Sequence, residues 1–167
     1  MKRVILCPNP YRDGELTVAK HSKEILEAIG FETVVCLPFS REGYDDQLGV
    51  PIRQLQPESK RADMLIAVDG DGTILHLARP VALQHLPVLG INLGNLGFMS
   101  ELEPNELERL RDLKSWDFAV ESRMMLDVTV LRDGKPVYNN IALNDAVISK
   151  GSVARVVRLD VSTEEGR

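Results

Sequence analysis

The segment MLIAVDGDGTILHLAR, from Met64 to Arg79, restricts the possible folds more than any other part of the chain. It begins with an apolar run, 64–68, which is typical of a strand buried on both faces. Glycines follow at positions 70 and 72, and a run with helical spacing begins directly after them. A strand, a tight turn and a helix in direct succession are typical of a βα unit in a parallel sheet.

Other segments show the same succession. Short apolar runs at 3–7, 31–37 and 87–92 predict further buried strands, and the apolar spacing over 15–30 predicts a helix that ends at Gly30. A stretch rich in proline, glycine and charge, before the Met64 run, predicts a loop with one short element. Strands that alternate with helices indicate a parallel sheet with ligands at the carboxyl ends of its strands.

The pattern changes after a short predicted helix over 104–116. Alternating apolar residues over 126–130, followed by an Asp133-Gly134 turn, predict a β-hairpin. A further alternating run, 154–163, predicts another strand.

We therefore expect an α/β, Rossmann-like parallel-sheet domain over 1–115, followed by the first strands of an antiparallel β domain over 116–167. About three strands have difficulty burying a face by themselves. For this reason we expect the β domain to be incomplete in this chain.

The composition argues against several function classes. The 20 basic residues are scattered and the formal net charge is -5, so we expect no nucleic-acid partner. No apolar run approaches the roughly 20 residues of a membrane helix, and the run at 4–7 is too short for a signal peptide. We expect no membrane partner and a cytoplasmic location. The cysteines and histidines lack metal-ligand spacing, so no metal site is expected.

The first motif, DGDGT, places Asp71 between two glycines at the end of a predicted strand. Glycine lets backbone N–H groups approach an anion, and a helix N-terminus supplies partial positive charge. An aspartate in this position can accept a hydroxyl proton or hold a metal-bound nucleotide. It can equally cap the helix, and the motif alone leaves both interpretations open.

Two further motifs follow the next strands. GINLGNLGF is rich in glycine but lacks the spacing of the dinucleotide fingerprint, and its Phe98 either lies against a purine or seals a domain junction. ALNDAVISKG places Asn144 and Asp145 inside an otherwise apolar predicted strand. Such a polar pair needs hydrogen-bond partners or an opening to a ligand, unless it marks a bulge or a strand end.

In this order, DGDGT, GINLGNLGF and ALNDAVISKG resemble the three N-terminal motifs of NAD kinases, and the strong resemblance covers about 64–163. SRMMLDV, at 122–128, is also similar to the family. The first motif is shared with diacylglycerol, sphingosine and phosphofructokinase-type kinases, whereas the second and third are more specific. The resemblance implies a phosphofructokinase-like first domain.

NAD kinases transfer the γ-phosphoryl group of ATP, with Mg²⁺, to the 2′-hydroxyl of the adenosine ribose of NAD, which gives NADP. Polyphosphate is the alternative phosphoryl donor. By resemblance, Asp71 orients and deprotonates that hydroxyl, and Gly72 allows close approach. Phe98 is expected to lie against the adenine. His76 is expected near the dinucleotide phosphates, and the alternative is a helix residue without a ligand.

The resemblance also assigns residues in the β region. Asn144 and Asp145 match an Asn–acid pair that hydrogen-bonds the dinucleotide. Arg155 falls where the family has a basic residue or histidine that contacts NAD, and an exposed strand cation is the competing interpretation. The full-length form is expected to be a homo-oligomer, as is common in the family.

Two departures from the family pattern matter. Asp69 stands where the family usually has glycine, so a second carboxylate either hinders phosphate by repulsion or makes Asp71 a better base. The downstream family motifs do not occur before Arg167, so we expect weak or no kinase activity from the isolated chain. The alternatives are a non-catalytic dinucleotide-binding module and a diacylglycerol-type lipid kinase, whose second motif differs from GINLGNLGF.

Overall fold

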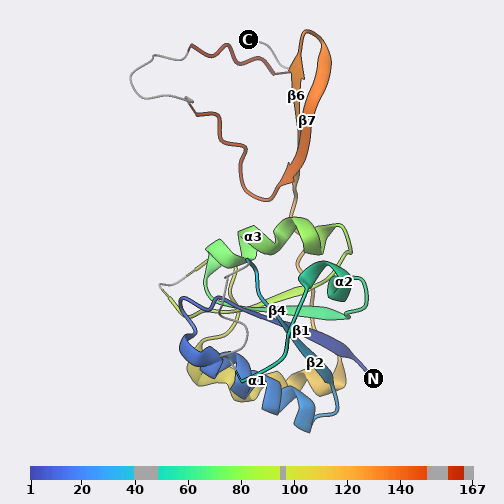
Figure 1. Cartoon of the computed structure of the whole chain (residues 1–167), viewed down its shortest axis with the longest axis vertical. Coiled ribbons are helices and arrows are strands. Elements are labelled where there is room, and N and C mark those ends of the chain that lie inside the picture. The colour runs from blue at the N-terminus through green and yellow to red at the C-terminus, as the bar shows by residue number, and fades with distance from the viewer. Residues whose placement is uncertain (40–48, 95–96, 150–157, 164–167) are drawn as a thin grey trace.

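The structure is a computed structural model that describes residues 1–39, 49–94, 97–149 and 158–163 (Figure 1). Its first region is an α/β unit, which confirms the fold class expected from the alternating strands and helices. In this region β marks strands, α marks α-helices and η marks 3-10 helices. The elements are β1 (Arg3–Pro8), η1 (Gly14–Leu16), α1 (Thr17–Ala28), β2 (Glu32–Cys36), β3 (Ile52–Arg53), α2 (Leu55–Ser59), β4 (Met64–Val68), α3 (Asp71–Ala82), β5 (Val88–Ile91) and η3 (Pro104–Ser115).

The five strands form one parallel sheet in the order β3-β2-β1-β4-β5. The chain builds outward from β1 to β2 and β3, then returns to β4 on the other side of β1. The strand order therefore reverses between β1 and β4, where Pro8 lies opposite Val68 in the register. In open α/β sheets, ligands bind outside the carboxyl ends of the strands at such a reversal.

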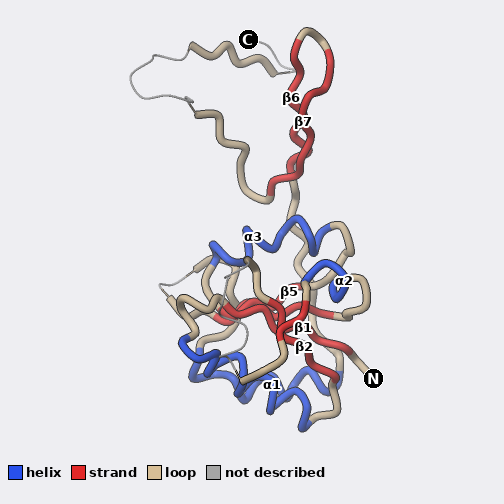
Figure 2. The backbone as a smooth tube through the Cα atoms, in the orientation of Figure 1, coloured by secondary structure: helices blue, strands red, loops and turns tan. Residues whose placement is uncertain are grey.

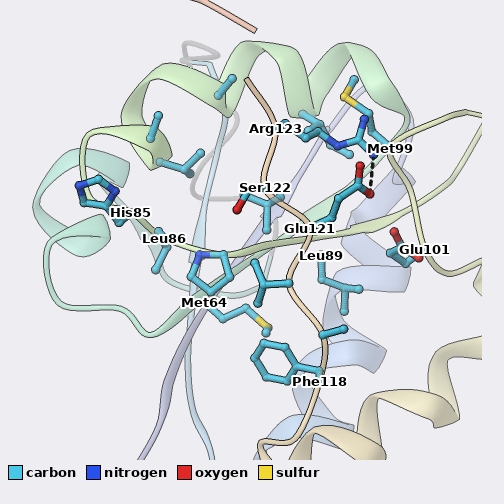
Figure 3. Close-up of a pocket in the computed structure, with 18 of the residues that line it drawn as sticks. Met64, His85, Leu86, Leu89, Met99, Glu101, Phe118, Glu121, Ser122 and Arg123 are labelled. Atoms are coloured by element: carbon cyan, nitrogen blue, oxygen red, sulfur yellow. Dashed lines mark hydrogen bonds and ion pairs between the residues drawn. The ribbon is translucent and has the colours of Figure 1, made fainter. Parts of the chain in front are cut away.

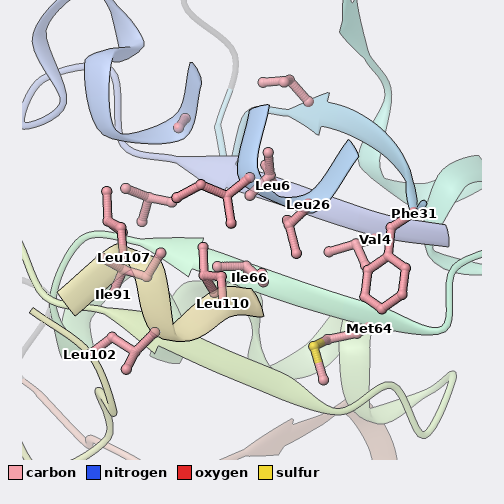
Figure 4. Close-up of a cluster of buried hydrophobic side chains, with 14 of the residues drawn as sticks. Val4, Leu6, Leu26, Phe31, Met64, Ile66, Ile91, Leu102, Leu107 and Leu110 are labelled. Atoms are coloured by element: carbon pink, nitrogen blue, oxygen red, sulfur yellow. The ribbon is translucent and has the colours of Figure 1, made fainter. Parts of the chain in front are cut away.

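Helices cover both faces of this sheet (Figure 2). Because neighbouring residues of a strand point to opposite faces, β1 contributes Val4 and Leu6 to one cluster and Ile5 and Cys7 to the other. The first cluster packs against α1 and η3 (Figure 4), and the second packs against α3. Burial of both faces explains why these strands read as continuous apolar runs.

Three local expectations need correction. The loop expected over 38–57 holds, among its described residues, two short elements rather than one: β3 and the start of α2. Helix α3 is not interrupted near Pro80 but continues through it to Ala82. Proline has no N–H, so the helical bond that position 80 would donate to the carbonyl of His76 is absent near the end of the helix. Of the strand expected over 154–163, residues 158–163 are described, and they contain no strand beyond a single β-bridge residue, Thr163.

The second region contains a hairpin, which confirms the expected Asp133-Gly134 turn. Its strands, β6 (Leu126–Arg132) and β7 (Lys135–Ala142), pair antiparallel and project away from the first region (Figure 1). Both turn residues have positive φ, 51° and 73°, as a tight two-residue hairpin turn requires. Large apolar side chains are exposed on both strands: Val130, Leu131, Val137 and Tyr138.

Candidate active site at the carboxyl edge of the sheet

The first motif lies at the reversal of strand order. Strand β4 ends at Val68, Gly70 is the N-cap of α3, and Asp71 begins the helix. The N–H groups of the first turn of α3 and the positive end of its dipole therefore point to the carboxyl edge of the sheet. The predicted position of the DGDGT turn, between a buried strand and a helix, is confirmed.

The carboxylate of Asp71 joins the first motif to the second. Its Oδ2 accepts the backbone N–H of Phe98 at 2.8 Å, and its Oδ1 accepts that of Met99 at 3.1 Å. Gly97 completes this contact, because a Cβ atom on that residue would lie only 2.3 Å from Oδ1 of Asp71. Glycine is thus required at position 97 by the close approach of the carboxylate.

Asn92 holds the other end of the glycine-rich loop, and the sequence analysis did not single it out. Its side chain is only 2% exposed; Oδ1 accepts the N–H of Gly94 at 3.1 Å, and Nδ2 donates to Glu103 Oε1 at 3.0 Å. The available signal was a polar residue directly after the apolar strand 88–91. A buried amide in this position must have partners, and here those partners shape the loop.

Asp69 and Asp71 have different hydrogen-bond partners. Oδ2 of Asp69 accepts Asn9 Nδ2 and Thr73 Oγ1, both at 2.7 Å. Its own backbone N–H donates to the carbonyl of Ile91 at 2.9 Å. The second carboxylate, which departs from the family pattern, is therefore built into the turn.

Three predicted site residues lie on or near α3 and the loop. Gly72 is exposed in the first turn of α3. Phe98 is 94% exposed, so its ring does not seal a junction between the described regions. His76 is also exposed, and its ring meets Phe39 edge-on with centroids 5.8 Å apart.

The predicted pair in the β region lies elsewhere. Asn144 and Asp145 follow the end of β7 in an exposed, irregular segment, so the expectation that they lie within a strand is wrong. No hydrogen bond or ion pair joins them to Asp71 or Phe98 in the part of the chain that the structure describes. Arg155 lies outside the described residues.

A cavity of about 1200 Å³ lies beside β5, beneath α3 (Figure 3). Its wall is mostly apolar and includes Ile74 of α3, Leu89 of β5, and Phe118. Of the second motif's Gly97–Met99 segment, only Met99 reaches it, and Asp71 does not line it. The cavity is thus separate from the carboxylate and its two amide donors.

The described residues contain no group of three or more His, Cys, Asp or Glu side chains that could hold a metal ion. Among the same residues, no helix has the length and apolar character needed to cross a membrane.

A parallel sheet with a glycine turn and a helix N-terminus at its reversal of strand order defines an α/β protein of the nucleotide-binding class. The family described as ATP-NAD kinase N-terminal domain matches residues 4–113. The chain belongs to this family, which confirms the resemblance to NAD kinases and gives no support to the lipid-kinase alternative; the match includes the first two motifs.

Individual relatives agree with the family assignment. An NAD kinase from Acetivibrio thermocellus is 32% identical over 160 residues, which cover 95% of this chain and 54% of that protein. An NAD kinase from Natranaerobius thermophilus is 37% identical over 165 residues, covering 96% and 55%. The chain thus spans about half the length of these curated relatives.

A solved structure shares the fold. The yeast NADH kinase complexed with NADH superimposes with a TM-score of 0.59 at 21% identity, over 85% of this chain and 46% of that one.

Proposed function

We propose that this chain carries the acceptor side of an NAD kinase, which phosphorylates the 2′-hydroxyl of the adenosine ribose of NAD with ATP to give NADP. One observation carries the proposal: Asp71 is held by the amides of Phe98 and Met99, so two separate family motifs meet at one carboxylate. The family assignment and the curated NAD kinases support it.

Asp71 is the proposed catalytic residue. Each carboxylate oxygen accepts one backbone N–H and has a second lone pair with which to accept a hydrogen bond from the ribose hydroxyl. The hydroxyl proton then passes to the carboxylate as the hydroxyl oxygen attacks the γ-phosphorus and the bond to the leaving ADP oxygen breaks. Phosphoryl transfer asks the protein chiefly for positioning, and two fixed amide donors supply it for this side chain.

The other predicted residues have proposed binding roles. Gly72 gives the ligand close access to the first turn of α3, because no atoms crowd its Cβ position. The exposed ring of Phe98 offers a face to the adenine. We propose that His76 contacts the dinucleotide phosphates and that Asn144, Asp145 and Arg155 contact NAD from the β region.

The donor is proposed to be ATP or polyphosphate, with the triphosphate near the N-terminus of α3. Magnesium is expected to arrive with the phosphates, since Mg²⁺ in such sites is bound largely by substrate oxygens and water. We also propose two domains: an α/β domain over 1–115 and an NAD-binding β domain that starts at 116. The proposed location is cytoplasmic, and the proposed full-length form is a homo-oligomer.

Calorimetric titration of the purified chain with NAD and with ATP, beside an assay for NADP, tests the proposal. We expect saturable NAD binding, with turnover well below about 1 per second, and loss of all turnover in Asp71→Asn. Asp133→Asn, in the hairpin turn, is the control and should match the parent chain. NADP formation that survives Asp71→Asn would show that another group is the base. Binding of NAD by this chain without any turnover would favour a non-catalytic module.

A further inference from the structure

Asp69 connects the turn after β1 to the first turn of α3, where the strand order of the sheet reverses. We propose that Asp69 is a positioning residue: its carboxylate fastens the turn after β1 to the first turn of α3 and thereby fixes Asp71 against the amides of the glycine-rich loop. The inference rests on the proposed function only for its consequence in catalysis. The positioning itself is a property of the fold and can be measured without substrate.

On the β1 side, Asp69 holds Asn9. The side-chain Nδ2 of Asn9 donates to Asp69 Oδ2 at 2.7 Å, and its backbone N–H donates to the carbonyl of Val68 at 3.0 Å. Asn9 Oδ1 in turn accepts the N–H of Tyr11 at 3.0 Å. Two hydrogen bonds thus tie the turn after β1 to the end of β4, across the reversal of strand order, and the third orders the turn itself.

On the helix side, Asp69 holds Thr73. Helix α3 has Gly70 as its N-cap, which supplies no side-chain hydrogen bond to the free amides of the first turn. The Oγ1 of the buried Thr73 donates to Asp69 Oδ2 at 2.7 Å, and the negative charge lies at the positive end of the helix dipole. Asp69 therefore stabilises a helix start that its own cap residue leaves weak.

Asp71 lies between these anchored points. It precedes Thr73 by two residues in the same turn of α3, while its carboxylate reaches Phe98 and Met99 across the site. A first turn that frays moves the Asp71 side chain away from both amides. Since the family usually has glycine at position 69, this attachment comes from the particular sequence of this chain.

The geometry separates hydrogen bonding from charge. One oxygen of Asp69, Oδ2, accepts both hydrogen bonds, so the single carbonyl oxygen of an asparagine can accept both as well. Asp69→Asn therefore keeps the attachment and removes the charge, whereas Asp69→Ala removes both. Asp63 is a matched control, because it flanks β4 at the opposite end and accepts the N–H of Arg3 at 2.8 Å.

Amide hydrogen exchange, followed residue by residue by NMR without substrate, tests the positioning. In Asp69→Ala we expect the Phe98 and Met99 amides to exchange about tenfold faster, the size expected from losing one to two hydrogen bonds. The buried Leu65 amide, bonded to Pro87 at 2.9 Å, reports global opening and is the reference within each variant. Asp69→Asn and Asp63→Ala should leave the ratio of Phe98 to Leu65 exchange within about twofold of the parent chain.

An unchanged ratio in Asp69→Ala would overturn the proposal, and so would an equal rise in Asp63→Ala. A rise in Asp69→Asn as large as in Asp69→Ala would show that charge, rather than the shared hydrogen bonds, holds the turn. NAD titration of the same variants keeps the two proposals apart. If exchange responds as expected but no variant or parent binds NAD, the positioning stands and the proposed function fails.

Discussion

The two regions of this chain use apolar residues in opposite ways. In the first region, helices cover both faces of the parallel sheet, and every residue of β4 is buried. In the second, β7 contacts α3, but no described helix covers a face of the hairpin, and none of the described residues after Leu110 is buried. The comparison teaches that strand pairing alone closes no core, because a sheet gains its stability from the layer that covers it.

The same contrast separates the candidate site residues. Asp71, Asn92 and Gly97 belong to turns that follow buried strands, so their contacts are fixed by the layers beneath them. Asn144 and Asp145 follow a hairpin strand whose faces are open. Residues in the first group have defined partners in the structure, whereas the roles of the second group rest on the family.

Thiol labelling gives the largest expected difference between the regions. Cys7 and Cys36 are fully buried in β1 and β2, and burial raises the pKa of Cys7 and raises that of Cys36 to about 12. At pH 8 both should react at least about a thousandfold more slowly than an exposed cysteine introduced by Lys135→Cys in the hairpin. Mass spectrometry after timed labelling measures the rates. Comparable rates for all three thiols would show that the first region is not closed.

These thiols also set a pH dependence. Their folded pKa values lie above the ordinary value of 9.0, so above pH 9 the unfolded chain releases protons that the folded chain retains. The contribution to stability is present below pH 9 and is lost as the pH rises above it. Replacement of both residues by serine should remove that part of the alkaline decline in the free energy of unfolding, measured by denaturant titration at several pH values.

A matched pair of leucines tests the two regions by stability. Leu65→Ala, in the centre of the covered sheet, should lower the free energy of unfolding by about 2–5 kcal/mol because it leaves a cavity. Leu131→Ala, at a hairpin side chain that is 62% exposed, should change it by no more than about 0.5 kcal/mol. Fluorescence of the single tryptophan, Trp116, which packs on Phe31 with centroids 5.5 Å apart, follows unfolding of the first region. Equal losses for the two variants would mean that the hairpin is also covered.

A pair of aspartates gives a smaller difference. The buried Asp13 accepts the N–H groups of Val18 and Ala19 at 2.9 Å each, at the start of α1. Asp13→Ala should cost about 1–2 kcal/mol, as expected for a helix cap. Asp127→Ala removes an exposed hydrogen bond from Asn139 at 2.8 Å and should cost less than about 0.5 kcal/mol. The contrast fails if thermal denaturation gives the two variants the same midpoint.

A pair of glycines gives the smallest effects, with opposite signs. Gly72 lies in the helical first turn of α3 with free space at its Cβ, so Gly72→Ala should raise the free energy of unfolding by about 0.5–1 kcal/mol. The same change should weaken NAD binding if ligand approaches this turn. Gly134→Ala strains a residue at φ 73° and should perturb the hairpin while leaving the Trp116 transition in place. A Gly72→Ala variant that gains stability and keeps full NAD affinity would remove Gly72 from the site.

Most of the fold could be predicted from local sequence patterns. Strand β4, its glycine turn and helix α3 were predictable. Strand burial, turn formation and helical spacing each depend on residues that are close together in the sequence. The Asp133-Gly134 hairpin was predictable for the same reason. The described part of the strand expected over 154–163 forms only a single β-bridge residue, Thr163, because alternation marks a face without supplying the neighbouring strand that it must pair with.

The contacts within the candidate site could not be predicted from the sequence. The Asp71 bonds to Phe98 and Met99, and the Asp69 bond to Asn9, join residues far apart in the sequence, and only the order of strands in the sheet brings them together. The glycine at position 97 was visible as part of a motif, but the reason for it was not. That reason is the carboxylate of Asp71 in the space where a side chain would begin.

We propose that Asp71 and the loop from Gly97 to Met99 form the site where NAD binds. Titration of the labelled chain with NAD, followed through the amide NMR signals, tests it directly. We predict that the Phe98 and Met99 amides show saturable shifts among the largest in the spectrum, and that Asp71→Asn greatly reduces them. Two results would contradict this claim. In one, NAD binds but shifts the amide signals of residues that line the cavity beside β5 and leaves those of Phe98 and Met99 unchanged. In the other, no saturable binding is seen at millimolar NAD.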